Sequence, residues 1–280
     1  MNASFDVVIV GGGVTGAAVG YGLAKRGVKT CLVDAVPTFS RASRANMGLI
    51  WCQSKALGCP QFVRWGFASS RAYGKLAAEL KELSGIDTGY APTGGIIPCL
   101  GEAELEARAQ FIEKLRAETE DGTYPASVLS RKELEGMLPK VPFGPEVSGG
   151  IWSDMDGYVD PLHLMFAFRK SFVRLGGTLF AGERVSEVKP SGKGYAVVCG
   201  GRTLECGKAV LAAGLGVRKL AAQLGTDIPV FPNKSQVMLL ERIPADVLPI
   251  PLLGIARTFG GTVMIGAAHE NMGMDRRLTP

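Results

Sequence analysis

The sequence predicts an α/β protein with two interleaved domains, on the strength of three observations. A complete β-α-β unit fits within the first 34 residues, strand-like runs fill much of the second half, and 38 of the 280 residues are glycine. Glycine is roughly twice as frequent as in an average protein, which indicates many sites of unusual backbone conformation or close approach. Hydrophobic residues make up 46% and charged residues 20% of the chain. This balance excludes an intrinsically disordered chain.

The charged residues, cysteines and histidines exclude several kinds of partner and site. The net charge of +5 is spread along the chain without a basic run, so we expect no nucleic-acid partner. The six cysteines form no C-x-x-C pair and there are only two histidines, which argues against a metal site. Residues 7–24 are uncharged, but glycines interrupt them and Asp6 precedes them. We therefore expect no signal peptide, no transmembrane segment and a cytoplasmic location.

The chain opens with the β-α-β unit. Residues 5–10 form a largely apolar, β-branched run, as in a strand that is buried on both faces. A helix is expected over residues 14–26, where Gly27 ends it. Residues 30–33 supply the second strand and complete the unit.

Helices and strands also alternate in the rest of the chain. Helical spacing or capping residues predict four further helices. They start at Pro60, near Leu105, after the capping box of Ser130 and Glu133, and after Asp160. Strand-like runs cover residues 88–100, 183–189, 195–199, 208–212, 235–240, 254–259 and 262–266. The stretch 139–150, rich in proline and glycine, is the expected crossing between the domains.

The turn between the first strand and the first helix has the pattern G-x-G-x-x-G. Its glycines are Gly11, Gly13 and Gly16, and Asp34 ends the second strand 18 residues later. The glycines allow a tight turn, approach of a pyrophosphate and close packing of helix on strand, while the acid binds ribose hydroxyls. The helix N-terminus favours the negatively charged phosphates. The sequence therefore predicts a dinucleotide site, and this unit by itself leaves both FAD and NAD open.

Further motifs resemble those of the FAD-dependent D-amino acid oxidase superfamily, which includes glycine oxidase, sarcosine oxidase and D-amino acid dehydrogenases. They are the glycine fingerprint, the loop of Ser43, Asn46 and Gly48, the strand ending at Gly214, the signature over residues 150–161, and Pro232 to Gln236. Residues 45–53 are most similar to the beta-type subunits of opine and proline oxidases. The resemblance implies a Rossmann-like FAD-binding domain over residues 1–88 and 150–224. It also implies an α+β substrate domain with an antiparallel sheet over residues 89–149 and 225–280.

The resemblance also implies a role for individual residues. The residues implied to hold FAD are Gly11, Gly13 and Gly16 with the amides of Val14 and Thr15, then Asp34, Ser43, Asn46, Gly48, Val185, Ala213 and Gly214. The family oxidises the C–N bond of an amino acid or secondary amine by hydride transfer to flavin N5. Trp51, Gln53, Arg257 and His269 are pocket candidates. Core packing is the alternative for Trp51, and a surface position is the alternative for Arg257 and His269.

Two other functions stay open at this stage. The family normally continues into a C-terminal segment that returns to the flavin, and no such motif is found here. This departure predicts a substrate domain that is incomplete at its C-terminus. It also suggests the alternative of a truncated or partner-dependent FAD-binding subunit in a hetero-oligomer. An NAD-dependent dehydrogenase with the same fingerprint is the second alternative.

Overall fold

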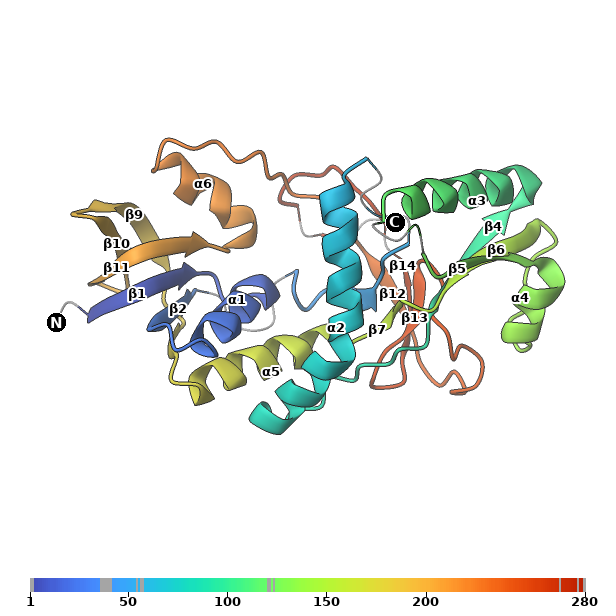
Figure 1. Ribbon diagram of the computed structural model, residues 1–280, viewed down its shortest axis with the longest axis horizontal. Helices are drawn as coiled ribbons and strands as arrows, with labels where there is room; N and C mark the ends of the chain where they lie inside the picture. The colour runs from blue at the N-terminus through green and yellow to red at the C-terminus, as the bar shows by residue number, and fades with distance from the viewer. Residues whose placement is uncertain are drawn as a thin grey trace.

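The computed structural model describes residues 3–35, 42–53, 55, 58–119, 122, 124–266, 268–275 and 277–278 of the chain. A six-stranded sheet with its helices forms one part, and a second part contains two three-stranded sheets (Figure 1). None of the helices in the described ranges is both long enough and apolar enough to cross a membrane.

The six-stranded sheet has a parallel core and an antiparallel edge. Its strand order is β8-β2-β1-β11-β10-β9, in which β8, β2, β1 and β11 run parallel. The last two strands pair antiparallel. The bounds are β1 Ala3–Val10, β2 Thr30–Asp34, β8 Thr178–Ala181, β9 Val185–Ser191, β10 Gly194–Cys199 and β11 Arg202–Leu211. Together with the antiparallel sheets described below, this arrangement confirms the predicted α/β class.

Both faces of strand β1 are buried, because its side chains alternate between two layers. Val8 and Val10 pack with Leu220 of helix α6 (Val217–Ala222) in one hydrophobic cluster. Ile9 packs with Ala24 and Phe172 in another, formed by helices α1 (Val14–Ala24) and α5 (Pro161–Arg174). The run of apolar residues that predicted this strand is therefore explained by a helix layer on each side of the sheet.

The second part of the molecule is organised around two small antiparallel sheets of orders β4-β6-β5 and β12-β14-β13. The bounds are β4 Gly95–Leu100, β5 Ala126–Ser130, β6 Val147–Ser153, β12 Val237–Leu240, β13 Ile255–Arg257 and β14 Val263–Gly266. Helix α3 (Gly101–Ala117) packs with β4 and β6. Helix α4 (Arg131–Met137) begins at the predicted capping box of Ser130 and Glu133. The two sheets are joined where Ile96 N–H donates to Pro251 O at 3.0 Å and Leu253 N–H to Ile96 O at 2.9 Å.

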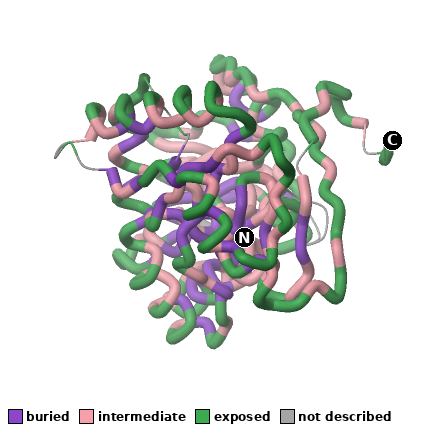
Figure 2. The backbone as a smooth tube through the Cα atoms, turned by 90° about the vertical axis from the view of Figure 1, so that its right-hand side faces the viewer, coloured by how far each residue is buried: buried purple, intermediate pink, exposed green. Residues whose placement is uncertain are grey.

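Helix α2 (Pro60–Ser84) connects the two parts (Figure 1). Near its start, Val63 and Phe67 pack in the cluster that contains Leu115 of α3. Near its end, Leu80 packs with Phe168 of α5. Buried stretches gather in the interior of the molecule, and exposed turns lie on the periphery (Figure 2). One helix therefore contributes to the cores of both parts and fixes their relative position.

The expected domain boundary at residue 150 falls inside β6. This strand pairs with β4 on one side and with β5 on the other. Because both neighbours are strands of the expected substrate domain, we propose that the FAD-binding domain resumes after Ser153. A two-stranded sheet follows there, in which β3 (Leu49–Ile50) pairs with β7 (Gly157–Tyr158).

Candidate functional site

The glycine turn after β1 packs directly against the end of β11. Gly11 has φ +106°, and a Cβ atom on it would lie 2.4 Å from Ala212 O. A Cβ atom on Gly16 would lie 1.9 Å from Gly11 O. Both distances are far below van der Waals contact, so only glycine fits at these two positions. The turn thereby brings the N-terminus of α1 to the carboxyl end of the parallel strands.

The first turn of α1 carries no negatively charged side chain. Its N-cap residue Gly13 has no side chain to accept a hydrogen bond. Ser43 lies above it, because the Val14 N–H donates to Ser43 Oγ at 3.0 Å. The positive end of the helix dipole and the hydroxyl of Ser43 together form a site suited to a phosphate.

Asp34 lies beside the glycine turn, at the end of β2. A Cβ atom on Gly12 would lie 2.9 Å from Asp34 Oδ2. The same oxygen accepts a hydrogen bond from Arg169 Nη1 at 3.3 Å, and the two side chains are only 6% and 12% exposed. Arg169 is a residue that the sequence analysis missed. It lies on α5, 135 positions further along the chain, and no local pattern connects it with Asp34.

The loop before β3 is held in shape by its own side chains. Asn46 Oδ1 accepts the Gly48 N–H at 2.9 Å, and Asn46 Nδ2 donates to Ala42 O at 3.0 Å. Gly48 has φ +68°, and a Cβ atom there would lie 2.1 Å from Val159 O. The Val159 N–H also donates to Gly48 O at 2.8 Å. This loop is therefore fixed against the residues that lead into α5.

The remaining predicted cofactor residues lie at the same edge of the sheet. Ala213 and Gly214 follow β11, and the Cα atom of Ala213 would lie 2.8 Å from a Cβ atom on Gly11. The Glu183 N–H donates to Asp34 O at 3.1 Å, so the segment that enters β9 at Val185 passes beside the end of β2. The structure thus brings residues from five separate segments to one edge.

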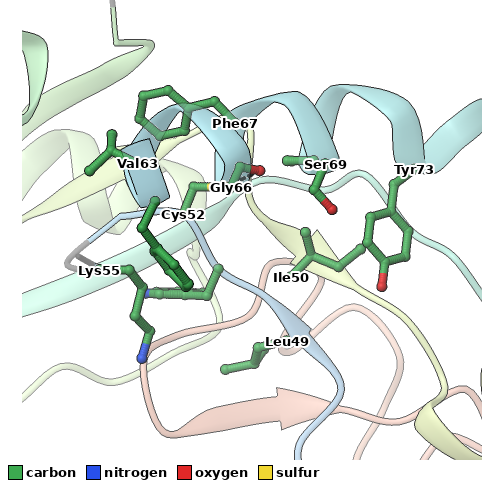
Figure 3. A pocket seen from close by; sticks show the side chains of 12 residues that line it. Leu49, Ile50, Cys52, Lys55, Val63, Gly66, Phe67, Ser69 and Tyr73 are labelled. Atoms are coloured by element: carbon green, nitrogen blue, oxygen red, sulfur yellow. Dashed lines mark hydrogen bonds between the residues drawn. The ribbon is translucent and has the colours of Figure 1, made fainter. Parts of the chain in front are cut away.

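A cavity of about 360 Å³ lies between α2 and the segment that follows β3. Figure 3 shows Lys55 and Tyr73 at opposite ends, with side chains of α2 above and Leu49 below. Its lining is mainly apolar and comprises Leu49, Ile50, Trp51, Cys52, Lys55, Phe62, Val63, Gly66, Phe67, Ser69, Ser70 and Tyr73. Trp51 lines this cavity and also packs against the hydrophobic cluster shared by α2 and α3, whereas Gln53 is fully buried.

The two other pocket candidates do not line this cavity. Arg257 donates from Nη1 to Gly261 O at 2.7 Å and from Nη2 to Ile243 O at 3.1 Å, so backbone carbonyls hold its guanidinium. His269 is exposed, and its Nδ1 lies 3.0 Å from Asn233 Oδ1. The cationic side chain in the lining is Lys55. No sequence motif pointed to it.

Comparison with known proteins identifies the family. Residues 6–280 match the family model described as FAD dependent oxidoreductase, DAO. The chain belongs to this family. It is 34% identical over 266 residues to an opine oxidase subunit of Agrobacterium tumefaciens (strain Ach5), and the match covers 95% of this chain and 71% of the relative. It is 28% identical over 284 residues to glycine oxidase of Geobacillus kaustophilus (strain HTA426), covering 100% and 74%.

A solved structure agrees with this assignment. Glycine oxidase from Geobacillus kaustophilus superposes with a TM-score of 0.87 at 27% identity, covering 99% of this chain and 75% of that one. As a member of the DAO family, the protein is an FAD-dependent oxidoreductase. The cradle formed by the glycine turn, the N-terminus of α1 and the carboxylate of Asp34 has the chemistry that the diphosphate and ribose of FAD require.

Proposed function

We propose that this protein oxidises a C–N bond of a carboxylate-bearing amino acid or secondary amine of the glycine, sarcosine, D-amino acid and opine class. One observation carries the proposal. The cavity wall continues directly from the loop at Gly48 beside the cofactor cradle, and Lys55 supplies a cation in an otherwise mainly apolar lining. An apolar cavity with one charged group is typical of a site for a small substrate with one anionic end.

The proposed cofactor residues are those predicted from the sequence. The glycine turn and Ser43 would hold the diphosphate, Asp34 the ribose, and the loop of Asn46 and Gly48 the approach to the ring. The chemistry that FAD would supply, when bound, is acceptance of a hydride from the amine-bearing carbon. The chain itself has to bind the carboxylate, exclude water and orient the carbon. Trp51 and Phe67 supply apolar surface for excluding water.

Lys55 is the proposed carboxylate-binding residue. It is exposed, and no hydrogen-bond or ion-pair partner is found for it among the described residues. Arg257, in contrast, already donates to backbone carbonyls. An ammonium group that pairs with a carboxylate makes a charge-assisted hydrogen bond, which is worth ~1.5–3 kcal/mol.

We expect Lys55→Met to raise KM for a carboxylate-bearing amine by ~10- to 100-fold, with a smaller effect on kcat, because the lost interaction contributes to binding throughout the reaction. Lys55→Arg should recover part of the loss. The matched control is Lys75→Met, at an exposed position of α2 outside the cavity lining. Equal KM values for Lys55→Met and the wild type would remove Lys55 from the proposal.

The reaction itself is tested by mixing the FAD-loaded chain anaerobically with single amines and following the visible flavin absorption. The panel is glycine, sarcosine, D-alanine, L-proline, iminodiacetate and an opine. Bleaching by one of them supports the proposal and names the substrate. Bleaching by none, in a protein that dithionite still reduces, contradicts amine oxidation by the chain alone.

A partner-dependent subunit is the second candidate. It is favoured by the names of several relatives, which are called subunits of opine oxidase and of hydrogen cyanide synthase. A purified chain that is colourless and takes up no added FAD would support this candidate. A yellow chain that an amine reduces without a second polypeptide would contradict it.

A further inference from the structure

A cluster of buried polar side chains lies behind the cavity wall, at the end of the β3–β7 ladder. Asp156 immediately precedes β7 and is 2% exposed, and Gln53 is fully buried. The Cys52 N–H donates to Asp156 Oδ1 at 2.6 Å. Gln53 Nε2 donates to Gly95 O at 2.9 Å. The carboxyl of Asp156 therefore binds the segment that carries Trp51 and Cys52 into the cavity lining.

Two oxygen atoms of this cluster have no hydrogen-bond partner among the described residues. They are Asp156 Oδ2 and Gln53 Oε1, and both are buried. Backbone and side chain of Gln53 both approach the Asp156 carboxyl. A buried acceptor without a donor costs free energy, and one acceptor cannot satisfy another. A proton on Asp156 Oδ2 would turn this oxygen from an unsatisfied acceptor into a donor.

The surroundings of Asp156 favour its protonated form. Burial raises the pKa of its carboxyl to about 6, although the Cys52 N–H and the nearby Gln53 lower it, and the neighbouring Asp154 raises it further. Two other titratable groups face the cluster, the Cys52 thiol and the Tyr124 hydroxyl, and burial raises the pKa of both. No lysine or arginine is among the groups that act most strongly on this carboxyl.

We propose that Asp156 is a positioning residue that holds the cavity wall as a neutral carboxylic acid. Its Oδ1 accepts the Cys52 N–H, and its protonated Oδ2 donates to Gln53 Oε1. Gln53 in turn donates to Gly95 O, which connects the wall to strand β4. Loss of the proton removes this proposed hydrogen bond to Gln53, so the carboxyl then holds the segment of Trp51 and Cys52 through the Cys52 N–H.

The test compares Asp156→Asn with the wild type and with Asp154→Asn. Asparagine mimics the neutral acid, because its amide donates to Gln53 Oε1 and its oxygen accepts the Cys52 N–H. Asp154 lies two residues away and is exposed, which makes it the matched control. Chemical unfolding of the purified full chain is measured at several pH values between 4 and 8, with and without FAD.

The sign of the effect follows from the raised pKa. The ordinary value is 3.8, so the folded chain holds this proton more tightly than the unfolded chain, and the stabilisation present at pH 4 is lost as pH rises through about 6. As pH rises from 4 to 8, we expect the equilibrium constant for unfolding of the wild type to increase by ~10- to 100-fold relative to that of Asp156→Asn. Asp154→Asn should follow the wild type.

Amide hydrogen exchange supplies a second, local readout. The Cys52 amide should keep its protection in Asp156→Asn at pH 8 and lose it in Asp156→Ala. The proposal would be overturned if the ratio of the unfolding constants of wild type and Asp156→Asn did not change with pH. It would also be overturned if Asp156→Asn did not fold, or if the Cys52 amide exchanged equally fast in Asp156→Asn and Asp156→Ala. Its link to catalysis rests on the proposed function. Neither unfolding nor amide exchange requires turnover. A chain that shows the expected pH dependence of unfolding but oxidises no amine would therefore contradict the proposed function and leave the role of Asp156 standing.

Discussion

Gly16→Ala is expected to abolish stable FAD binding. The added Cβ atom would lie 1.9 Å from Gly11 O and 3.2 Å from the Cβ atom of Ala212, so α1 has to move away from the glycine turn. Overpacking of this kind costs at least ~1–3 kcal/mol. It also withdraws the helix N-terminus from the diphosphate. We expect FAD affinity to fall by at least ~100-fold, measured by titration of FAD fluorescence and by the visible spectrum of the purified protein.

The control for this experiment lies in the same helix. Among the described residues, a Cβ atom on Gly22 would meet only Arg26 Nη1, at 3.6 Å. Gly22→Ala should therefore bind FAD as the wild type does and be more stable by up to ~1 kcal/mol, because alanine is the better helix former. Wild-type affinity in Gly16→Ala would show that this turn does not approach the cofactor.

Asp34→Ala is expected to lower both FAD affinity and stability. Without the hydrogen bonds that the ribose hydroxyls would donate to this carboxylate, FAD affinity should fall by ~10- to 100-fold. The substitution also removes a carboxylate that pairs with Arg169 in a site where both side chains are largely buried. Removing one partner of a buried ion pair costs about 3 kcal/mol. The two effects are measured separately, by FAD titration and by chemical unfolding of the apoprotein.

The double variant Asp34→Ala/Arg169→Met separates the two roles of Asp34. It removes the guanidinium together with its carboxylate, so part of the lost stability should return. The lost FAD affinity should not return, because the ribose still has no acceptor. Full recovery of FAD affinity in the double variant would contradict a direct contact between Asp34 and the cofactor.

The cofactor cradle was predictable because its signals are local. Gly11, Gly13 and Gly16 stand between a strand and a helix in one short stretch, and Asp34 ends the next strand. The same reasoning placed the starts of α2, α4 and α5, where Pro60, Ser130 and Asp160 occupy the capping or first helical positions. In each case, neighbouring residues determine the structure.

The rest of the site depends on contacts between distant segments. Lys55 lines the cavity only because α2 folds back over the strand before it. Asp154 and Asp156 stand two positions apart in the sequence, yet one is exposed and the other is buried against Cys52. Strands β5 and β8 were not predicted. Four or five residues carry too little periodicity to be recognised without their neighbours in the sheet.

Helix α5 determines how far apart two contacts of the cofactor site lie, one at Gly48 and one at Asp34. The residues that enter it hold the loop at Gly48 through Val159, and ten positions later Arg169 meets Asp34. Arg169 lies eight positions after Pro161, the first residue of α5, so at 1.5 Å per residue the helix spans ~12 Å between its start and this anchor. A one-residue deletion between them would shorten this span and turn Arg169 by ~100° around the axis. The number of residues in α5 between the two anchors is therefore constrained by the site that Asp34 and Gly48 form.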